Sequence, residues 1–267
     1  MRRPLWIARA VLAELRVALM LALQYRASFL GEALMAGLWI GYTLLPLFVV
    51  FHTRAGAGIG DWSWDGALLV LGFFVTLEGL LSSFVSPNLT AVVEQVRAGT
   101  FDFVLLKPLD AQLLVSVHRT DPTQLPHVLA GLAVVGVAAS RLPQPPGAQE
   151  WLLGAALLAC GVLILHSLWT VVVATSFWFV RVDNLSALLS SLVDAGRWPV
   201  SFYKGAVRFV LTFLLPVGLM TTWPALALQR LLDAREVLLA AGVCLAFLLV
   251  SRAVWRLAIG HYSSASS

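Results

Sequence analysis

The sequence predicts an all-α, polytopic membrane protein with six transmembrane helices, and its composition and hydropathy support this fold class. Of the 267 residues, 60% are hydrophobic and only 12% are charged, and the mean hydropathy is +0.87. A soluble domain carries about 25% charged residues, so this chain has too few to cover an aqueous surface. The apolar residues form long runs, and a spanning helix needs roughly 20 of them in succession. Lipid is therefore the predicted solvent for most of the chain.

Residues 1–26 are predicted to form an N-terminal amphipathic helix that lies in the headgroup region of the membrane. Leu, Ala and Val fill this segment between five basic residues, which are Arg2, Arg3, Arg9, Arg16 and Arg26. A basic amphipathic helix of this kind suits the surface of an anionic leaflet. The alternative is that the segment begins a long first span. Residues 27–260 then form a single transmembrane domain.

The first four spans are predicted from apolar runs at residues 27–51, 66–89, 126–139 and 151–180. The third run is short for a full crossing, and an earlier start, within the polar segment 90–125, is the alternative. The fourth run contains no Asp, Glu, Lys or Arg, and it is long enough to tilt or to project past the bilayer.

Residues 185–228 allow two interpretations. In the first, residues 205–228 form a single span, although Pro216 and Pro224 interrupt it. In the second, a span at 184–200 is followed by a re-entrant hairpin between spans 5 and 6, since irregular backbone at membrane depth is tolerated where protein covers it. The last span is predicted at residues 237–258.

The distribution of basic residues predicts the orientation. We place the N-terminus in the cytoplasm and take residues 205–228 as a single span. Then 14 of the 18 Lys and Arg residues lie inside, and those outside are Arg54, Arg141, Arg230 and Arg235. The second interpretation moves Arg197, Lys204 and Arg208 outward, which leaves 11 inside and seven outside. Cytoplasmic loops collect Lys and Arg, so both termini are predicted to be cytoplasmic. The positive charge then reflects topology and does not indicate binding of nucleic acid.

The polar segment 90–125 contains the most informative motif. Gly99 is expected to end one helix and Thr100 to cap the next. Residues 101–106 would then form a short helix that stops at Pro108. This helix has more apolar residues than a solvated loop needs, which indicates a docking surface for another protein. The alternative is that it packs against the ends of its own spans.

The run from Val96 to Leu109, VRAGTFDFVLLKPL, resembles the loop of ABC-2-type transporter permeases, in which R-x-G-T-(L/F)-(D/E)-x-x-L-x-x-P-L recurs. It is most similar to the branch of daunorubicin-type exporters. Phe101 stands where Leu is commoner, which is a mild departure. The basic N-terminal segment, the number of spans and residues 197–204 fit the same family, so the resemblance covers the whole chain, although only the loop is specific.

The resemblance implies the transmembrane (permease) subunit of an ATP-binding cassette exporter, which moves an amphipathic or hydrophobic substrate outward across the bacterial inner (plasma) membrane. Two separate ATPase subunits, which bind ATP and Mg, would dock beneath it. A second permease chain, identical or a sister, would complete a dimer. The residues implied in ATPase coupling are Glu94, Arg97, Gly99, Thr100, Phe101, Asp102, Lys107 and Pro108. The chain itself is predicted to be non-catalytic and to need no cofactor, since it lacks the Gly-x-x-x-x-Gly-Lys-Ser/Thr run that holds phosphates.

Three residues within the spans are further candidates. Glu78 lies near the middle of the second span, where a carboxylate usually faces the bundle interior or a water-filled path, and it is the candidate for the translocation path. The alternative for Glu78 is a structural role as a protonated or hydrogen-bonded group. Gly37 and Gly41 form a GxxxG motif in the first span, which lets two helices approach closely, and they are the candidate dimer contact.

Two other classes of function remain as alternatives. A membrane-embedded enzyme needs a nucleophile, a base or metal ligands at one depth; Glu78 and His166 are too few, and no metal-ligand spacing occurs. An ion-coupled secondary transporter usually shows internal repeats with paired broken helices, and the sequence has one candidate break rather than two.

Overall fold

The computed structural model describes residues 16, 20, 26–53, 62–117, 119–178, 189–191 and 193–262. The predicted interfacial helix at 1–26 lies almost entirely outside these residues, as does the start of the predicted span at 184–200. The longer helices are α2 (Arg26–Thr53), α3 (Trp64–Leu80), α4 (Ser86–Arg97), α7 (Leu125–Ser140), α8 (Ala148–Ala174) and α12 (Ala234–Gly260). The shorter helices are α5 (Asp102–Leu105), α6 (Ala111–Val117), α10 (Gly205–Phe209) and α11 (Trp223–Leu228). The described part also contains short 3₁₀ or π segments. They are η1 (Leu81–Val85), η2 (Pro122–Gln124), η3 (Thr175–Phe177), η4 (Asp194–Arg197), η5 (Val200–Phe202), η6 (Val210–Leu214) and η7 (Gly218–Thr222).

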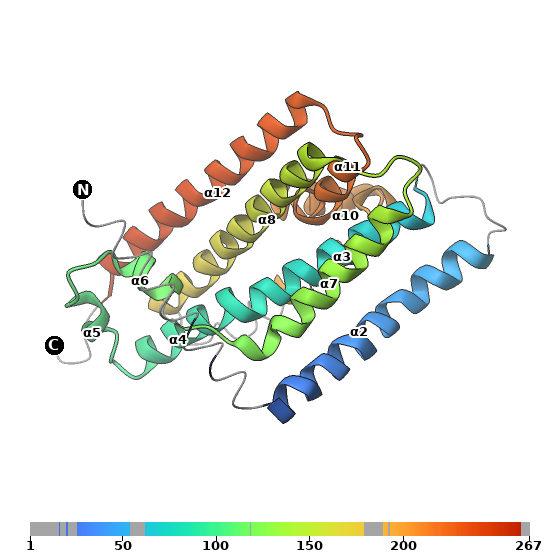
Figure 1. Cartoon of the computed structure of the whole chain (residues 1–267). Coiled ribbons are helices and arrows are strands. Elements are labelled where there is room, and N and C mark those ends of the chain that lie inside the picture. The colour runs from blue at the N-terminus through green and yellow to red at the C-terminus, as the bar shows by residue number, and fades with distance from the viewer. Residues whose placement is uncertain are drawn as a thin grey trace.

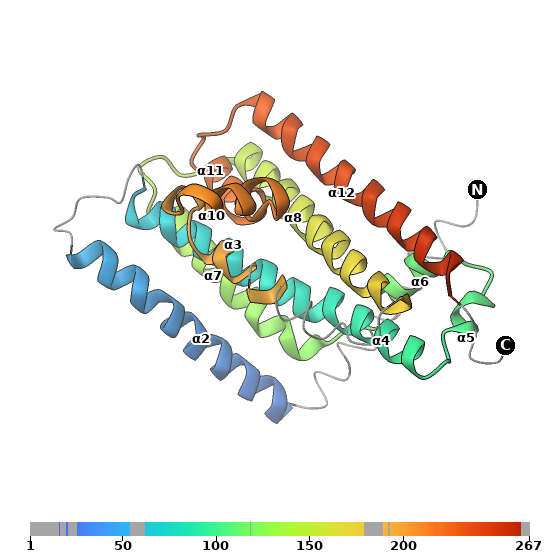
Figure 2. The ribbon, with the colours of Figure 1, turned by 180° about the vertical axis from the view of Figure 1, so that it is seen from behind.

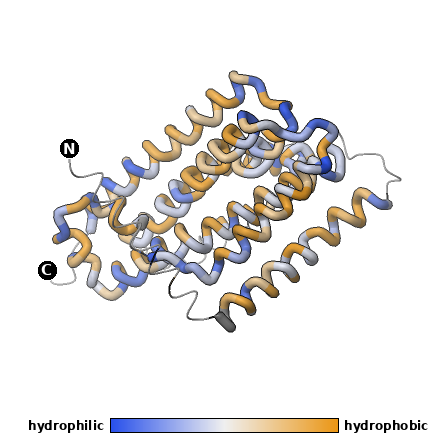
Figure 3. Tube along the Cα trace, viewed as in Figure 1, coloured by the Kyte–Doolittle hydropathy of each residue, from blue (hydrophilic) through white to orange (hydrophobic). Residues whose placement is uncertain are grey.

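Five helices of the described residues are long and apolar enough to cross a membrane. They are Phe29–Thr53, Trp64–Arg97, Pro122–Ser140, Ala148–Phe177 and Ala234–Gly260. These helices form one bundle, with α2 and α12 on its two flanks (Figure 1). Hydrophobic residues follow the lengths of the helices, while hydrophilic residues gather at the two ends of the bundle (Figure 3). The all-α, polytopic membrane fold that the composition predicted is therefore confirmed.

The bundle has two ends, which we name the α5 end and the Trp62 end. α5 and α6 lie at one end, and α10 and α11 lie toward the other (Figures 1 and 2). The Phe177 ring, just after α8, contacts the Phe101 ring beside α5, with centroids 5.3 Å apart. At the opposite end, the Trp62 indole N–H donates to the Ser201 hydroxyl at 2.9 Å. Phe177 and Ser201 therefore lie at opposite ends of the bundle.

The helices of residues 205–228 form a re-entrant hairpin at the Trp62 end. Its arms, Gly205–Leu214 and Gly218–Leu228, are bent by 70° relative to each other at the break that contains Pro216. The first arm and Gln229, just after the second arm, line one cavity together with Trp62, so the hairpin enters and leaves at the same end. Its turn reaches deeper, because Val217 lies against Gly196, which also borders Phe74 of α3. This geometry supports the re-entrant hairpin of the second interpretation, and the surrounding helices cover the broken backbone. The start of the predicted span at 184–200 lies outside the described residues, so that span stays a prediction.

The second span is longer than the sequence predicted. α3, η1 and α4 form one continuous helix of 34 residues from Trp64 to Arg97, which at 1.5 Å per residue is about 50 Å long. The hydrocarbon core of a bilayer is only about 30 Å thick, so the α4 part projects beyond it. The helix therefore continues past the predicted end of the span at residue 89, because hydropathy marks where the chain leaves the lipid and not where the helix ends. The third span starts at Pro122, earlier than the apolar run itself, as the alternative held.

α3 is the central helix, and it packs closely against α7 through glycines. A Cβ atom on Gly131 would lie 2.5 Å from the Thr76 backbone nitrogen, and one on Gly72 would lie 2.7 Å from Val135. Small residues of this kind let two helices in a membrane approach until their backbones nearly touch. Most of α3 is therefore covered by protein, and its polar residues face neighbouring helices and not lipid.

Candidate functional site

α4 ends at Gly99 in a Schellman motif, which turns the chain toward α5. The Gly99 N–H donates to the Val96 carbonyl at 3.2 Å, and the Thr100 N–H donates to the Gln95 carbonyl at 2.9 Å. Gly99 has φ +68°, a left-handed conformation that glycine adopts without steric cost. Gly99 therefore ends the helix as predicted. Thr100 does not cap α5, because its hydroxyl lies 3.4 Å from the Gln95 carbonyl and closes the preceding helix instead.

The side chain of Phe101 points into the protein, where it is completely buried. Its ring makes edge contacts with three other rings, those of Phe177, Trp255 and Tyr262, at centroid distances of 5.3, 6.2 and 5.7 Å. We call these four residues the aromatic cluster. Such pairs contribute about 0.5–1.5 kcal/mol each beyond the burial of apolar area. The cluster fixes the start of α5 against the ends of α8 and α12.

The opposite side of α5 is apolar and exposed. The side chains of Phe103 and Leu106 are 69% and 79% exposed, and Leu105 and Leu109 beside them are also exposed. We call these four residues the α5 face. α5 lies at the end of the bundle, beyond the helices that are long and apolar enough to cross a membrane (Figure 1). An exposed apolar patch outside the membrane marks a surface for binding another protein.

An ion pair ties the segment after α5 to α12. The Arg252 guanidinium makes a two-pronged interaction with the Asp110 carboxylate, and its Nη1 atom also donates to Gln112 Oε1 at 2.9 Å. The hydrogen bond from Arg252 lowers the pKa of the Asp110 carboxyl, against the opposing effect of partial burial. Planar, two-pronged pairs of Arg with a carboxylate are the more directional kind of ion pair. This contact therefore holds the α5–α6 connection in one orientation against α12.

Three further hydrogen bonds tie α6 and the chain after it to the bundle. His166 Nε2 in α8 lies 2.8 Å from the Ser116 hydroxyl in α6. The Asn88 amide group, in α4, accepts from the Arg119 N–H and donates to the Arg119 carbonyl, both at 2.6 Å. The segment from α5 to Arg119 is thus attached to α4, α8 and α12 on its inner side.

The remaining residues predicted for ATPase coupling lie around this segment. Glu94 and Arg97 are exposed in the last turn of α4, and Glu94 faces Arg119 at 3.9 Å. Lys107 and Pro108 are exposed just after α5. Asp102 lies in the first turn of α5, close to Tyr262, and burial followed by this carboxylate raises the pKa of Tyr262.

Sequence reasoning missed the inner half of this site. It did not connect Trp255, Tyr262 and Arg252 with the loop, because these residues lie at the far end of the chain. One signal was available: a cation such as Arg252 inside an apolar span usually has a partner, and Asp110 is a carboxylate at the matching end of the bundle.

Gly37 and Gly41 lie on an open face of α2. A Cβ atom on either glycine would meet no atom within 4 Å. The buried residues of α2, which are Ala36, Thr43, Leu47 and Phe51, lie on a different face of the helix. The GxxxG motif therefore makes no contact within the described part of the chain.

Glu78, near the end of α3, lies inside the bundle at the edge of a cavity of about 180 Å³. Trp39 of α2, Ser82, Gln124 and His127 line the same cavity. Among the described residues, no three His, Cys, Asp or Glu side chains are grouped closely enough to hold a metal ion.

These features define a multi-pass membrane protein that presents a short apolar helix at one end of its bundle. The family model described as "ABC-2 family transporter protein" matches residues 38–266. The chain belongs to this family, and it is therefore a membrane (permease) component of an ATP-binding cassette transporter. No curated protein matches the chain, and no solved structure does. The daunorubicin-type branch stays a prediction.

Proposed function

We propose that this permease works as an exporter and that the α5 face is the surface through which a separate ATPase drives it. The observation that supports this most directly is the exposure of Phe103 and Leu106 on a helix whose other side is anchored. Two large apolar side chains on a short, fixed helix can insert into a groove of a partner, where buried aromatic anchors dominate binding. The nucleotide and Mg would be held by that partner, since this sequence has no phosphate-binding loop.

The proposal fixes the orientation. ATP is cytoplasmic, so the α5 end faces the cytoplasm of a bacterial cell and the Trp62 end faces outward. The first turn of α2 and the last turn of α12 both lie toward the end of the bundle that carries α5, which supports cytoplasmic termini (Figure 1). An amphipathic or hydrophobic substrate would then move from the α5 end toward the Trp62 end.

The contacts of the α5 segment indicate how movement of the ATPase would reach the spans. The aromatic cluster joins α5 to α8 and α12, and Asp110 joins the next turn to Arg252 of α12. A displacement of α5 therefore acts first on these two helices. Packed side chains transmit such a displacement because a close-packed interior is stiff.

A second permease chain would pack against α2. The open face that carries Gly37 and Gly41 also exposes Leu34, Leu38 and Leu45. Two glycines one turn apart allow close approach of a partner helix in a membrane. The complete transporter would then contain two permease chains and two ATPase subunits, and the partner permease would be a second copy or a sister chain.

Co-purification with candidate ATPases tests the proposal. We expect stoichiometric co-elution of the wild-type chain, and loss of the ATPase from the double variant Phe103→Ala/Leu106→Ala. Phe213→Ala/Leu214→Ala is the matched control, because these side chains are 69% and 66% exposed at the Trp62 end. If both double variants retain the ATPase equally, or if the chain elutes alone and transports with an ion gradient, the proposal is wrong.

A further inference from the structure

A polar groove leads from the α5 end into the membrane-spanning part of the bundle. Its outer part is a cavity of about 420 Å³ between the α3–α4 helix and residues 119–124. Its inner part is the 180 Å³ cavity that ends at Glu78. The two cavities adjoin, because Ser82 and Gln124 line both of them, and we call the two together the polar groove.

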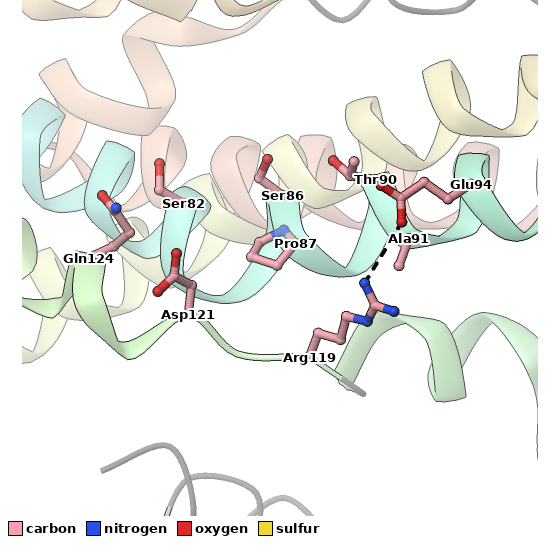
Figure 4. Close-up of a pocket in the computed structure, with 9 residues that line it drawn as sticks. All are labelled: Ser82, Ser86, Pro87, Thr90, Ala91, Glu94, Arg119, Asp121 and Gln124. Carbon is pink, nitrogen blue, oxygen red and sulfur yellow. Dashed lines mark ion pairs between the residues drawn. The ribbon is translucent and has the colours of Figure 1, made fainter. Parts of the chain in front are cut away.

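One side of the groove is a row of polar side chains at four-residue intervals, which are Glu78, Ser82, Ser86, Thr90 and Glu94. In a regular α-helix such a row drifts around the axis by roughly 40° per step. The π segment η1, Leu81–Val85, widens the turn in the middle of this row and offsets part of the drift. Figure 4 shows Ser82, Ser86 and Thr90 in succession along this helix, with Asp121 and Arg119 on the segment that faces it.

The carboxylates of Glu94 and Glu78, at the two ends of the groove, differ in the charged groups around them. Arg119, at the mouth, faces Glu94 at 3.9 Å. Asp194 and Arg197, outside this cavity, also interact electrostatically with Glu78, and they form an ion pair with each other at 3.5 Å. The groups that line the inner cavity with Glu78 are the uncharged side chains of Trp39, Ser82 and Gln124, together with His127.

The inner cavity also holds unused hydrogen-bonding capacity. The Nδ1 atom of His127 is buried and has no hydrogen-bond partner among the described residues. Buried polar atoms are normally paired with protein, water or a ligand. Trp39 supplies an indole beside Glu78, and an aromatic face attracts a cation that has left water.

We propose that the polar groove binds an organic cation, with its ammonium group at Glu78 and Trp39. The row of hydroxyl groups replaces water for the cation on its way in, and the carboxylate compensates its charge at membrane depth. This inference deepens the proposed function and rests on it for direction: the groove opens at the α5 end, so the cation enters from the cytoplasm. The ammonium group could belong to a soluble amine or to a lipid headgroup.

Equilibrium binding of radiolabelled choline to the purified permease in lipid nanodiscs tests the inference. The competitor is 3,3-dimethylbutanol, the uncharged analogue in which carbon replaces the nitrogen atom. We expect saturable binding of choline and at least about tenfold weaker competition by the analogue. Nanodiscs of phosphatidylcholine and of phosphatidylglycerol distinguish the sources: a lipid headgroup in the groove lowers choline binding only in phosphatidylcholine, whereas a site for soluble amines binds choline equally in both.

Variants identify the groove as the site. Glu78→Gln should weaken choline binding at least about tenfold, and Trp39→Leu about fivefold, while thermal unfolding confirms that each variant is folded. Asp233→Asn is the matched control, because it also replaces a carboxylate by an amide but lies at the Trp62 end, where Asn can still cap α12. Equal affinity for choline and its analogue, or wild-type binding by the folded Glu78 and Trp39 variants, would overturn the inference. No ATPase is present in this assay, so failure of ATPase co-elution refutes the proposed function separately.

Discussion

Phe101 and Phe103 lie two residues apart in the α5 segment and are predicted to have opposite roles. The Phe101 side chain is fully buried in the aromatic cluster, and the Phe103 side chain is 69% exposed on the α5 face. We expect Phe101→Ala to destabilise the α5 segment while leaving the docking surface in place. We expect Phe103→Ala to weaken docking while leaving stability unchanged.

The structure sets the size of each effect. Truncating a fully buried Phe to Ala costs about 3–5 kcal/mol, because the apolar contacts are lost and a cavity remains. On the scale of soluble domains, about 2–4 °C per kcal/mol, this lowers the melting temperature by roughly 6–20 °C. An exposed substitution changes stability by only about 0.5 kcal/mol or less. Loss of an aromatic anchor from an interface costs about 1–2 kcal/mol, which is roughly a 5- to 30-fold loss of affinity.

Two assays separate the effects. Thermal unfolding with amide hydrogen exchange across residues 99–117 reports stability, and titration of the purified permease with its ATPase reports docking. Phe101→Leu keeps most of the buried volume and loses the ring contacts, so it should fall between the wild type and Phe101→Ala. The reasoning is refuted if Phe101→Ala unfolds like the wild type, or if Phe103→Ala lowers the melting temperature as much as Phe101→Ala does.

Three further predictions follow from particular contacts. Gly41→Leu should leave the single chain stable, since a Cβ atom at this position meets nothing within 4 Å. The variant should convert dimers to single permease chains in light-scattering measurements. Persistence of the dimer would exclude this face of α2 as the dimer contact. Gly131→Ala should destabilise the α3–α7 contact by about 1–3 kcal/mol, because its Cβ would collide with Thr76. Gly136→Ala, on the same helix, has open space at its Cβ and should be neutral or stabilising. Equal melting temperatures of the two variants would contradict the close packing. The pKa of Asp110 is lower in the folded protein, so its contribution to stability is present above the unfolded pKa of about 3.9 and is lost as the pH falls through the folded value. The difference in melting temperature between the wild type and Asp110→Asn should therefore be full at pH 7, begin to shrink near about pH 4, and disappear only below the folded pKa. A difference that grows on acidification would contradict the ion pair with Arg252.

Much of the candidate site could be predicted from local sequence. The run from Val96 to Leu109 contains its own signals for a helix end at Gly99 and for a short apolar helix before Pro108, and the structure has both. These features depend on the conformational range of single residues and on hydrogen bonds between near neighbours, which do not require knowledge of the fold.

The orientation of α5 could not be predicted in the same way. Phe101 and Phe103 are the same residue type, so hydropathy does not distinguish them. Which of them is buried depends on Phe177 and Trp255, whose positions follow from the packing of α8 and α12. The polar groove could not be predicted for the same reason. Glu78 is visible in the sequence as a carboxylate within a span, but its neighbours Trp39 and His127 come from other helices.

By itself, the sequence determined that lipid surrounds this protein and approximately where the chain enters and leaves it, since transfer from water to lipid depends on the composition of each segment. Only the tertiary structure decided that residues 205–228 return to the end at which they enter, that α4 extends the second span to Arg97, and that α2 leaves its glycine face open. The physical reason is that within a membrane the hydrophobic effect no longer selects which helix faces meet. Shape, close packing and a few buried polar contacts select them instead, and these join residues that are distant in the sequence.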